Sequence, residues 1–333
     1  MGSATRYEKS RPSWPRLVCY GPTLSGHAAQ ENRSSGICQQ VFWQPPTSRE
    51  DALGSQAEVP ELPEVEALRR SLDGPVSAAP IEHAGPAHLA TLKTAEPPLQ
   101  TLEGRRFIGA RRRGKRLLFP TGDGELVLVV HLMSAGRLRM LAAQKRGPAA
   151  PAFRLAFAGG ARLILTEPGK RKRAGVWLLT PELAEQELAH LGPDALGLEP
   201  AMLARLCKGE RRRLHGFLRD QRVLAGIGRA WANEILHVAR LSPFALAGDL
   251  DTEALGRLAE AIDSELRRGI ELREQGLSNE DVYRVHGKLG RPCHVCATQV
   301  ARVAFEEHTV YYCPRCQTGG RKLADRRLSR LLR

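Results

Sequence analysis

The pattern of hydrophobic and polar residues changes twice along the chain. Between Leu62 and Leu72 apolar residues recur every three or four positions, which is the spacing of one helical face. From about 100 to 180 they alternate with polar residues or form short runs such as 126–130, separated by glycine-containing turns. From 191 to 275 the helical period returns. The pattern therefore predicts a helix, then a β domain, then a helical domain.

These segments divide the chain into five parts. Residues 60–190 are expected to form a β-sandwich that carries the first helix, and 191–285 a helical domain. A small cysteine-rich unit at 286–318 and a basic tail at 319–333 follow. Residues 1–59 show neither a period of 3.6 nor a period of two, so we expect an unpatterned extension there.

The excess of positive charge belongs to the part that is expected to fold. The chain has 50 Lys and Arg residues against 36 Asp and Glu residues, a formal net charge of +14. Six basic and five acidic residues lie in 1–59, which leaves 44 basic and 31 acidic residues in 60–333. A basic folded part favours a polyanionic partner such as nucleic acid. No apolar run approaches the roughly 18 residues of a membrane span, and neither a signal peptide nor a transit peptide fits the first segment.

Four of the seven cysteines form two close pairs near the C-terminus. Two residues separate Cys293 from Cys296 and Cys313 from Cys316, and sixteen lie between the pairs. This spacing is typical of four thiolates that hold one structural Zn²⁺ ion, whereas buried free thiols and a bound iron are the alternatives. An odd cysteine count with such pairs argues against a secreted disulfide framework, so we expect a cytoplasmic protein.

Three further segments carry candidate chemistry. Residues 225–228, Ala-Gly-Ile-Gly, must turn, and the turn leaves backbone N–H groups at the start of the next helix that could hold a phosphate. Most such turns merely connect elements. Lys115 lies in the basic segment 111–116, ahead of an apolar strand. The opening segment 60–64, Pro-Glu-Leu-Pro-Glu, would by itself be an ordinary helix start.

These segments and the cysteine pairs stand in one order along the chain. Their order and residues make the chain resemble the bacterial formamidopyrimidine-DNA glycosylase and endonuclease VIII family over residues 60–316. The resemblance implies a bifunctional DNA glycosylase and abasic-site lyase of base excision repair, which removes oxidised bases and cuts the strand by β,δ-elimination. Pro60 matches the family's N-terminal nucleophile, which forms a Schiff base, and Glu61 matches the general acid and base. Lys115 matches the lysine that holds a phosphate or ring oxygen near the lesion.

The resemblance also implies the architecture and the partner. The expected fold is α+β: an N-terminal β-sandwich with a catalytic N-terminal helix, a helix-two-turn-helix domain and a C-terminal zinc finger. The expected partner is damaged double-stranded DNA whose lesion is flipped out of the stack, bound by a monomer in the bacterial nucleoid. The DNA contacts fall to His131, Lys172, Arg173, Arg229 and His308.

Several positions depart from the family pattern. Arg229 stands where asparagine is usual and His308 where arginine is usual, so we expect a weaker or pH-sensitive grip on phosphate. Ala174 replaces a frequent aromatic and Met133 comes one place early, which predicts an altered wedge and tolerance of single-stranded or bubble DNA. The short segment 276–291 leaves little room for a loop over an oxidised purine. This favours the endonuclease VIII side of the family, with oxidised pyrimidines and abasic sites as substrates and 8-oxoguanine as the alternative.

One feature opposes this chemistry. Pro60 is internal, so its nitrogen is an amide that cannot form a Schiff base. We predict that translation starts at Val59, whose GTG codon can initiate in bacteria, and that the preceding residues do not belong to the native protein; proteolytic maturation is the alternative. The rival functions are a catalytically inactive DNA-damage-binding protein on the same scaffold and a zinc-stabilised RNA-binding protein, although no aromatic platform motif supports the latter.

Overall fold

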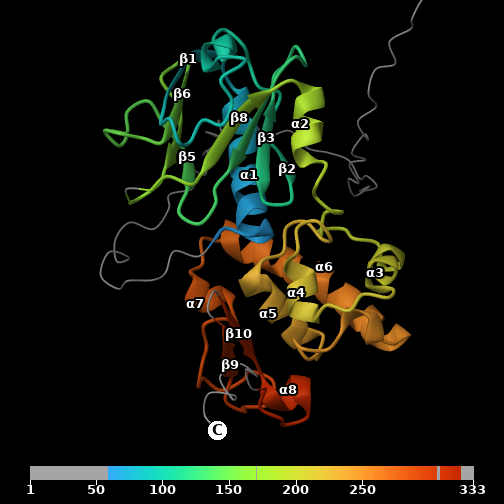
Figure 1. Cartoon of the computed structure of the whole chain (residues 1–333). Helices are drawn as coiled ribbons and strands as arrows, with labels where there is room; N and C mark the ends of the chain where they lie inside the picture. The colour runs from blue at the N-terminus through green and yellow to red at the C-terminus, as the bar shows by residue number, and fades with distance from the viewer. Residues whose placement is uncertain (1–58, 170, 306–307, 324–333) are drawn as a thin grey trace, which may run out of the picture. The chain divides into compact units, whose positions relative to one another are not determined.

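The computed structural model describes residues 59–323, except for 170, 306 and 307. The extension predicted at 1–59 therefore lies outside the described residues apart from Val59, and so do residues 324–333 of the basic tail. Helices and strands both contribute to the described part, as Figure 1 shows. No helix among these residues combines the length and the apolar character that crossing a bilayer requires.

The strands between 81 and 179 form two four-stranded antiparallel sheets, in the orders β2-β3-β4-β8 and β1-β6-β7-β5. Both sheets contribute to one hydrophobic core, which contains Phe119 and Val130 from the first and Phe153 and Leu165 from the second. The predicted β-sandwich is therefore confirmed. The strands are β1 (Ile81–Ala87), β2 (Arg111–Arg113), β3 (Arg116–Pro120), β4 (Val127–His131), β5 (Arg137–Leu141), β6 (Phe153–Phe157), β7 (Arg162–Thr166) and β8 (Gly175–Leu179), with a 3-10 turn at Leu99–Leu102.

Helix α1 (Leu62–Ser77) joins this core to the next one. A proline in its first turn and a capping box between Glu61 and Glu64 define its start. Val65 and Val76 are buried in the core of the sandwich, whereas Leu62 is buried in the core of the helices that follow. The helix predicted from the apolar spacing is confirmed, and it holds the residues at its N-terminus between the two cores.

Six helices lie between the sandwich and the cysteine-rich unit in the described part of the chain. Helix α2 packs against β4 and β8, while the others surround the buried Trp231. Gly269 allows α6 to approach this ring, because a Cβ there would lie 2.2 Å from a Trp231 ring carbon. The elements are α2 (Pro181–Leu188), α3 (Pro200–Cys207), α4 (Leu214–Arg219), α5 (Arg229–Val238), α6 (Thr252–Glu274) and α7 (Asn279–Val282), with a 3-10 turn at Ala247–Asp249.

A small cysteine-rich unit ends the described chain. It consists of the antiparallel hairpin β9 (Ala301–Ala304) and β10 (Thr309–Tyr312), followed by α8 (Pro314–Thr318). Gln317 of α8 donates a hydrogen bond from its amide to the carbonyl oxygen of Leu241, at 2.9 Å. Strand β10 and helix α8 also contact α5, so the unit is anchored to the helical core.

Candidate active site and metal centre

Glu61 is the N-cap residue of α1, and its carboxylate lies against the start of α5. Its Oε2 accepts hydrogen bonds from the backbone N–H groups of Gly228 at 2.6 Å and Trp231 at 3.2 Å, and its Oε1 accepts one from Ala230 at 2.9 Å. The first N–H groups of a helix have no partner within the helix, so they suit a buried carboxylate. Burial nevertheless raises the pKa of Glu61, and the positive charge of Lys115 opposes this shift. Glu61 can therefore hold a proton at higher pH than an exposed glutamate.

The glycines of the turn before α5 are required by close contacts. A Cβ at Gly228 would lie 2.3 Å from Cδ of Glu61, and one at Gly226 would lie 2.4 Å from a methyl carbon of Leu62. Gly226 also has a φ of +112°, a conformation that side chains rarely adopt. The expectation that this turn offers free N–H groups to phosphate is wrong for the groups that Glu61 occupies.

Gln221 braces the same turn. Its side-chain amide donates to the carbonyl oxygens of Arg219 at 2.9 Å and Ile227 at 2.7 Å, and its Oε1 accepts from the N–H of Gly226 at 2.9 Å. The sequence alone did not single out this residue. A glutamine five residues before a glycine forms no recognisable motif, although its role follows from the turn once the fold is known.

Glu64 connects the start of α1 to three other segments. Its Oε2 accepts from the backbone N–H of Glu61 at 3.0 Å and so closes the capping box at the start of the helix. Its Oε1 accepts from Arg273 Nε at 2.8 Å, from the Trp231 indole at 3.3 Å and from the Tyr283 hydroxyl at 3.4 Å. Arg273 and Tyr283, which the sequence did not indicate, therefore help to position the opening segment.

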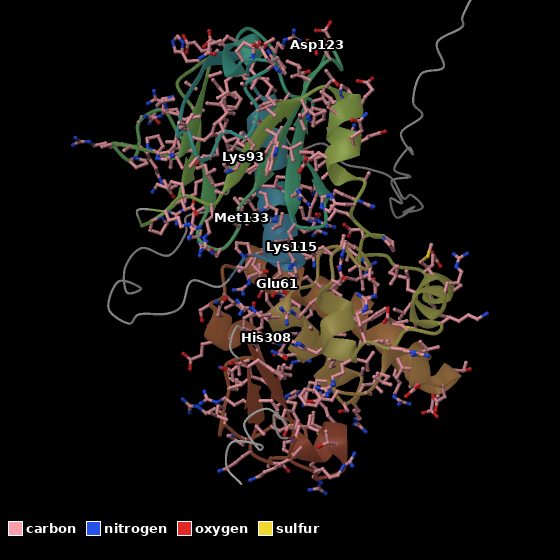
Figure 2. The ribbon with its side chains drawn as sticks, in the orientation of Figure 1. Glu61, Lys93, Lys115, Asp123, Met133 and His308 are labelled. Atoms are coloured by element: carbon pink, nitrogen blue, oxygen red, sulfur yellow. The ribbon has the colours of Figure 1, made fainter. Side chains whose placement is uncertain are left out.

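Lys115 lies at the tip of the β2–β3 hairpin and next to Glu61, as Figure 2 shows. Gly114, with a φ of +57°, forms the turn with it, and the Gly114 N–H donates to Asp194 at 2.8 Å. Arg112 pairs with the same aspartate at 2.7 Å and thereby fixes the hairpin. Burial lowers the pKa of Lys115, whereas Glu61 raises it. Pro60, Glu61 and Lys115 are thus brought to one place, with the half-buried Pro60 directly before the acid.

The predicted DNA contacts on the sandwich differ in their surroundings. His131 ends β4, and its Nδ1 accepts from the Met133 N–H at 3.1 Å. Burial and the charges of Arg116 and Lys115 lower the pKa of His131 to about 4, so the ring is neutral at pH 7. Met133 is 39% exposed and has a φ of +52°. The apolar side chain of Met133 is therefore exposed to solvent at this loop.

Lys172 and Arg173 lie in the loop before β8, which Glu167 organises. The Glu167 carboxylate accepts from the N–H groups of Arg173 at 2.9 Å and Ala174 at 3.0 Å. The ammonium of Lys172 donates to backbone carbonyls of its own loop, whereas the Arg173 side chain is exposed. Ala174 is completely buried, so its methyl group is covered by protein and does not form an exposed wedge.

His308 belongs to a column of rings between α4 and the β9–β10 hairpin. Its ring stacks on that of Phe305, with centroids 4.7 Å apart, and on that of His215, at 5.9 Å. Burial lowers the pKa of His215 to about 3, with smaller contributions from Arg219 and His308. Phe244 continues the column at 6.2 Å from Phe305. The packing holds His308 near α4 rather than on an isolated loop.

The two cysteine pairs meet in space. Cys296 Sγ lies 3.4 Å from Cys313 Sγ and 3.5 Å from Cys316 Sγ, and the sulfurs of Cys293 and Cys316 are 3.9 Å apart. Four thiolates about 2.3 Å from one ion would be separated by about 3.8 Å, so the cluster fits a tetrahedral ion. His237 of α5 adds a fifth donor, because His237, Cys293, Cys313 and Cys316 place ligand atoms within 4.8 Å of one another. These residues can hold a metal ion.

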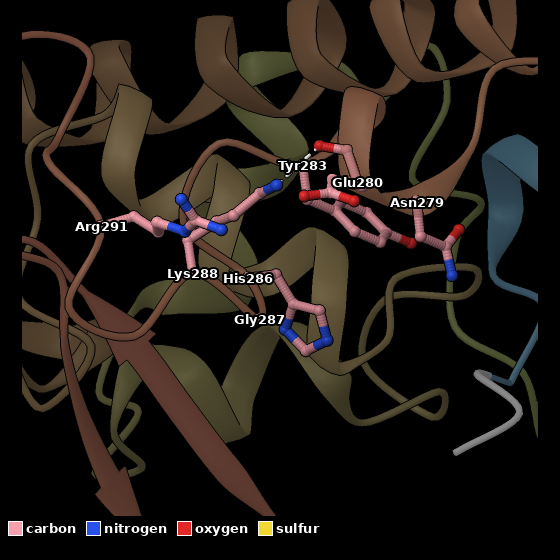
Figure 3. A pocket seen from close by; sticks show the side chains of 7 residues that line it. All are labelled: Asn279, Glu280, Tyr283, His286, Gly287, Lys288 and Arg291. Carbon is pink, nitrogen blue, oxygen red and sulfur yellow. Dashed lines mark hydrogen bonds between the residues drawn. The ribbon is translucent and has the colours of Figure 1, made fainter. Parts of the chain in front are cut away.

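A pocket of about 240 Å³ lies beside the Glu64 network, and Figure 3 shows its lining residues. Tyr283 and His286 form an aromatic wall, with ring centroids 5.2 Å apart. Tyr283 also hydrogen-bonds to Glu64, and the charge of His286 acts on Glu61. The pocket is thus close to the candidate acid. Its lining consists of Asn279, Glu280, Tyr283, His286, Gly287, Lys288 and Arg291.

Two family models match the chain. The formamidopyrimidine-DNA glycosylase N-terminal domain matches residues 59–174, and the formamidopyrimidine-DNA glycosylase H2TH domain matches residues 191–281. A formamidopyrimidine-DNA glycosylase from Salmonella paratyphi B is 31% identical over 278 residues, which cover 78% of this chain and 100% of the relative. An uncharacterized formamidopyrimidine-DNA glycosylase-like protein from Mycobacterium tuberculosis is 47% identical over 149 residues, 43% of this chain and 94% of that protein.

Solved structures share the fold. A structure of MutM in complex with DNA that contains carbocyclic 8-oxo-G superposes with a TM-score of 0.70 at 24% identity, covering 78% of this chain and 100% of that one. A complex of Lactococcus lactis Fpg with abasic-site DNA superposes with a TM-score of 0.71 at 23% identity, covering 78% and 99%. The predicted α+β fold class is confirmed.

Proposed function

Because this chain belongs to the formamidopyrimidine-DNA glycosylase family, a family of DNA-repair enzymes, we propose that it acts on damaged DNA as a glycosylase and an abasic-site lyase. The family expected from the sequence is thereby confirmed. The observation that carries the finer proposal is the buried Glu61 carboxylate, directly after Pro60 and next to Lys115.

The proposed reaction begins at Pro60. Its secondary amine, once free, forms a bond to C1′ of the damaged nucleoside, and the departing base takes the electron pair of the glycosidic bond. Glu61 donates its proton to O4′ as the sugar ring opens and an iminium forms. Loss of a C2′ proton then expels the 3′ phosphate, and a second elimination expels the 5′ phosphate. The raised pKa of Glu61 supports a group that holds this proton before the reaction.

The site also suggests which groups hold the substrate. We assign Lys115 to a phosphate or ring oxygen beside the lesion, and Arg229, His308, His131, Lys172 and Arg173 to further DNA contacts. The neutral His131 would donate a hydrogen bond rather than a charge. Damaged double-stranded DNA is the proposed partner, and the contacts of a flipped nucleotide would centre on Glu61.

The pocket beside Glu64 supports the preference for oxidised pyrimidines. A volume of about 240 Å³ with an aromatic wall suits one small flipped base, and the short segment that lines it contributes no long covering loop. We therefore place this chain on the endonuclease VIII side in substrate choice, with 8-oxoguanine as the alternative. A panel of duplexes with single lesions tests this, and a clear preference for 8-oxoguanine would contradict it.

We further propose that the cysteine cluster holds one structural Zn²⁺ ion through Cys293, Cys296, Cys313 and Cys316. Bound there, the ion would fix the hairpin that carries His308. His237 is then a neighbour of the ligands, because its Nε2 lies 3.2 Å from Cys293 Sγ and can donate to that thiolate.

A catalytically inactive DNA-damage-binding protein is the second candidate, and one observation favours it. The nitrogen of Pro60 is bonded to Val59 in the chain as written, so it has no lone pair available for attack. The enzyme proposal therefore requires a chain whose first residue is Pro60, whether by initiation at Val59 or by proteolysis.

The decisive experiment traps the Schiff base with borohydride on an oligonucleotide that contains one abasic site. It compares the full chain, a chain that begins at Pro60, and the latter with Glu61→Gln. We expect an adduct only in the chain that begins at Pro60, with a much slower appearance in the Glu61→Gln variant. An adduct in none of them would favour the binding protein. An adduct in the full chain would identify another amine, and its loss in Lys115→Arg would assign that amine to Lys115.

A further inference from the structure

Arg219, the last residue of α4, differs from the arginines around it. Asp220 pairs with Arg212 at 2.7 Å and with Arg222 at 2.9 Å, but not with Arg219. The Arg219 side chain is half-buried, and it makes no hydrogen bond or ion pair with any residue of the described part of the chain. A partly buried cation without a counter-ion is costly unless a ligand supplies the negative charge.

The backbone of Arg219 is fixed beside the candidate active site. Gln221 donates one hydrogen bond to its carbonyl oxygen and another to Ile227, and the next residue, Gly228, donates to Glu61 at 2.6 Å. The turn that orients the acid therefore also holds the end of α4 in place.

Among the described residues, the charges around Arg219 include no carboxylate paired with its own guanidinium. Burial lowers the pKa of Arg219, the charge of Arg229 lowers it further, and Glu61 raises it. Burial likewise lowers the pKa of Lys115, where Glu61 and Glu64 oppose the shift and Arg219 and Arg229 add to it. Two carboxylates, Glu61 and Glu64, act on Lys115, and both already have partners: Glu61 accepts three backbone hydrogen bonds, and Glu64 pairs with Arg273 at 2.8 Å. Arg219 is therefore the cation of this region that a bound anion would serve.

We infer that the Arg219 guanidinium binds a phosphodiester of the DNA backbone beside the lesion, together with Lys115. The inference rests on the proposed function and adds to it a residue that binds phosphate, outside the motifs of the sequence. A guanidinium presents a planar set of N–H donors, which matches two phosphate oxygens at once. Free phosphate offers the same chemistry, so the test must separate the two sources.

The experiment measures the affinity of the full chain for a duplex with one tetrahydrofuran abasic analogue and for the same duplex without it, over a salt series. The variants are Arg219→Met, Arg219→Lys and, as a matched control from the neighbouring turn, Arg222→Met. For Arg219→Met we expect about tenfold weaker binding to the abasic duplex and a salt slope smaller by about one. Arg219→Lys should keep the slope, and Arg222→Met should keep the ratio between the two duplexes.

Thermal unfolding without DNA separates binding from folding. Removing an unpaired cation should leave the Tm of Arg219→Met equal to that of the wild type or raise it. A lower Tm with equal losses on both duplexes would mean a structural role and overturn the inference. An unchanged slope and ratio in Arg219→Met would overturn it as well, while leaving the proposed function intact.

Two further outcomes of these experiments would have different meanings. A wild-type chain that shows neither a preference for the abasic duplex nor a salt dependence would overturn the proposed function and this inference together. The last measurement repeats the thermal unfolding with added inorganic phosphate at constant ionic strength. If it raises the Tm of the wild type but not of Arg219→Met, without a loss specific to the abasic duplex, the site binds free phosphate and the DNA assignment is wrong.

Discussion

At position 228, the need for glycine comes from a neighbouring side chain and not from the backbone conformation of Gly228 itself. Its φ of −123° and ψ of −151° are open to any residue, yet a Cβ would lie 2.3 Å from Cδ of Glu61. Only the absence of a side chain lets the carboxylate reach the start of α5. The sequence marks the glycine as a turn residue, whereas its actual role depends on a residue 167 positions away.

Gly228→Ala is therefore expected to displace Glu61. We predict a loss of stability of about 1–3 kcal/mol, as for overpacked cores, and a loss of lyase rate of about 100-fold from the misplaced acid. Gly216→Ala is the matched control, because Gly216 lies in α4 with nothing within 4 Å of its Cβ position, and it should be slightly stabilising. Urea unfolding and single-turnover cleavage measure both effects. Normal cleavage by Gly228→Ala would contradict the assigned role of Glu61.

The raised pKa of Glu61 predicts a pH dependence for a chain that begins at Pro60. Burial favours the neutral acid, so the step that needs its proton should persist above the ordinary value of 4.5 and decline as pH rises through the raised pKa. Lys115 opposes this shift, so Lys115→Met should move the alkaline limb of the rate profile to higher pH while lowering the rate. Single-turnover rates across pH test this, and a limb moved to lower pH would contradict it.

At the residue scale, the sequence indicated the groups that stand in a motif. The motifs contain Pro60, Glu61 and Lys115, and the structure brings these three residues together. Arg273 and Gln221 could not be found in this way, because each is an isolated polar residue whose partners come from other segments. Hydrogen bonds between distant segments leave no period in the sequence.

At the scale of elements, the spacing of apolar residues predicted which segments are helices and which are strands, but not which strands pair with one another. The period in α6 follows its buried residues Leu258, Ile262 and Leu266, and α1 was likewise visible. The sheet order β1-β6-β7-β5 was not, since a period of two shows that a strand has one buried face without indicating which strand lies beside it. Strand partners are set by packing in three dimensions.

The metal centre gives a prediction at this scale. Cys296→Ser should lose the ion, whereas His237→Gln should retain it with about 10–100-fold weaker affinity, as expected for a residue that contacts a ligand. Metal content per chain, before and after a chelator, measures this. Cys207→Ala is the control, because Cys207 is buried among the helices and should not alter metal content. A full ion in Cys296→Ser but none in His237→Gln would assign the fourth ligand to His237 instead.

Removal of the ion should also affect the neighbouring elements unequally. The hairpin β9–β10 and its ring column depend on the cysteine unit, so we expect weaker DNA binding, whereas the sandwich has its own core and should stay folded.

At the scale of the whole molecule, composition and motif order together were informative. The net charge of +14 alone indicates only a polyanionic partner. The order of the segments indicated the family, which the matching domain models support over residues 59–174 and 191–281. What no composition predicts is that α1 contributes to two hydrophobic cores at once. That arrangement depends on the packing of both cores around one helix.

The contact between Glu61 and α5 limits where this chain could be divided into two polypeptides without losing the site. The acid and Gly228 are separated by 167 residues, and the match to the Mycobacterium tuberculosis relative spans only 149. A stretch of that length can contain the acid or the backbone groups that receive it, but never both. A break in the chain anywhere between residues 61 and 228 would therefore put the acid and these backbone groups on separate polypeptides, and neither piece alone would hold the complete site.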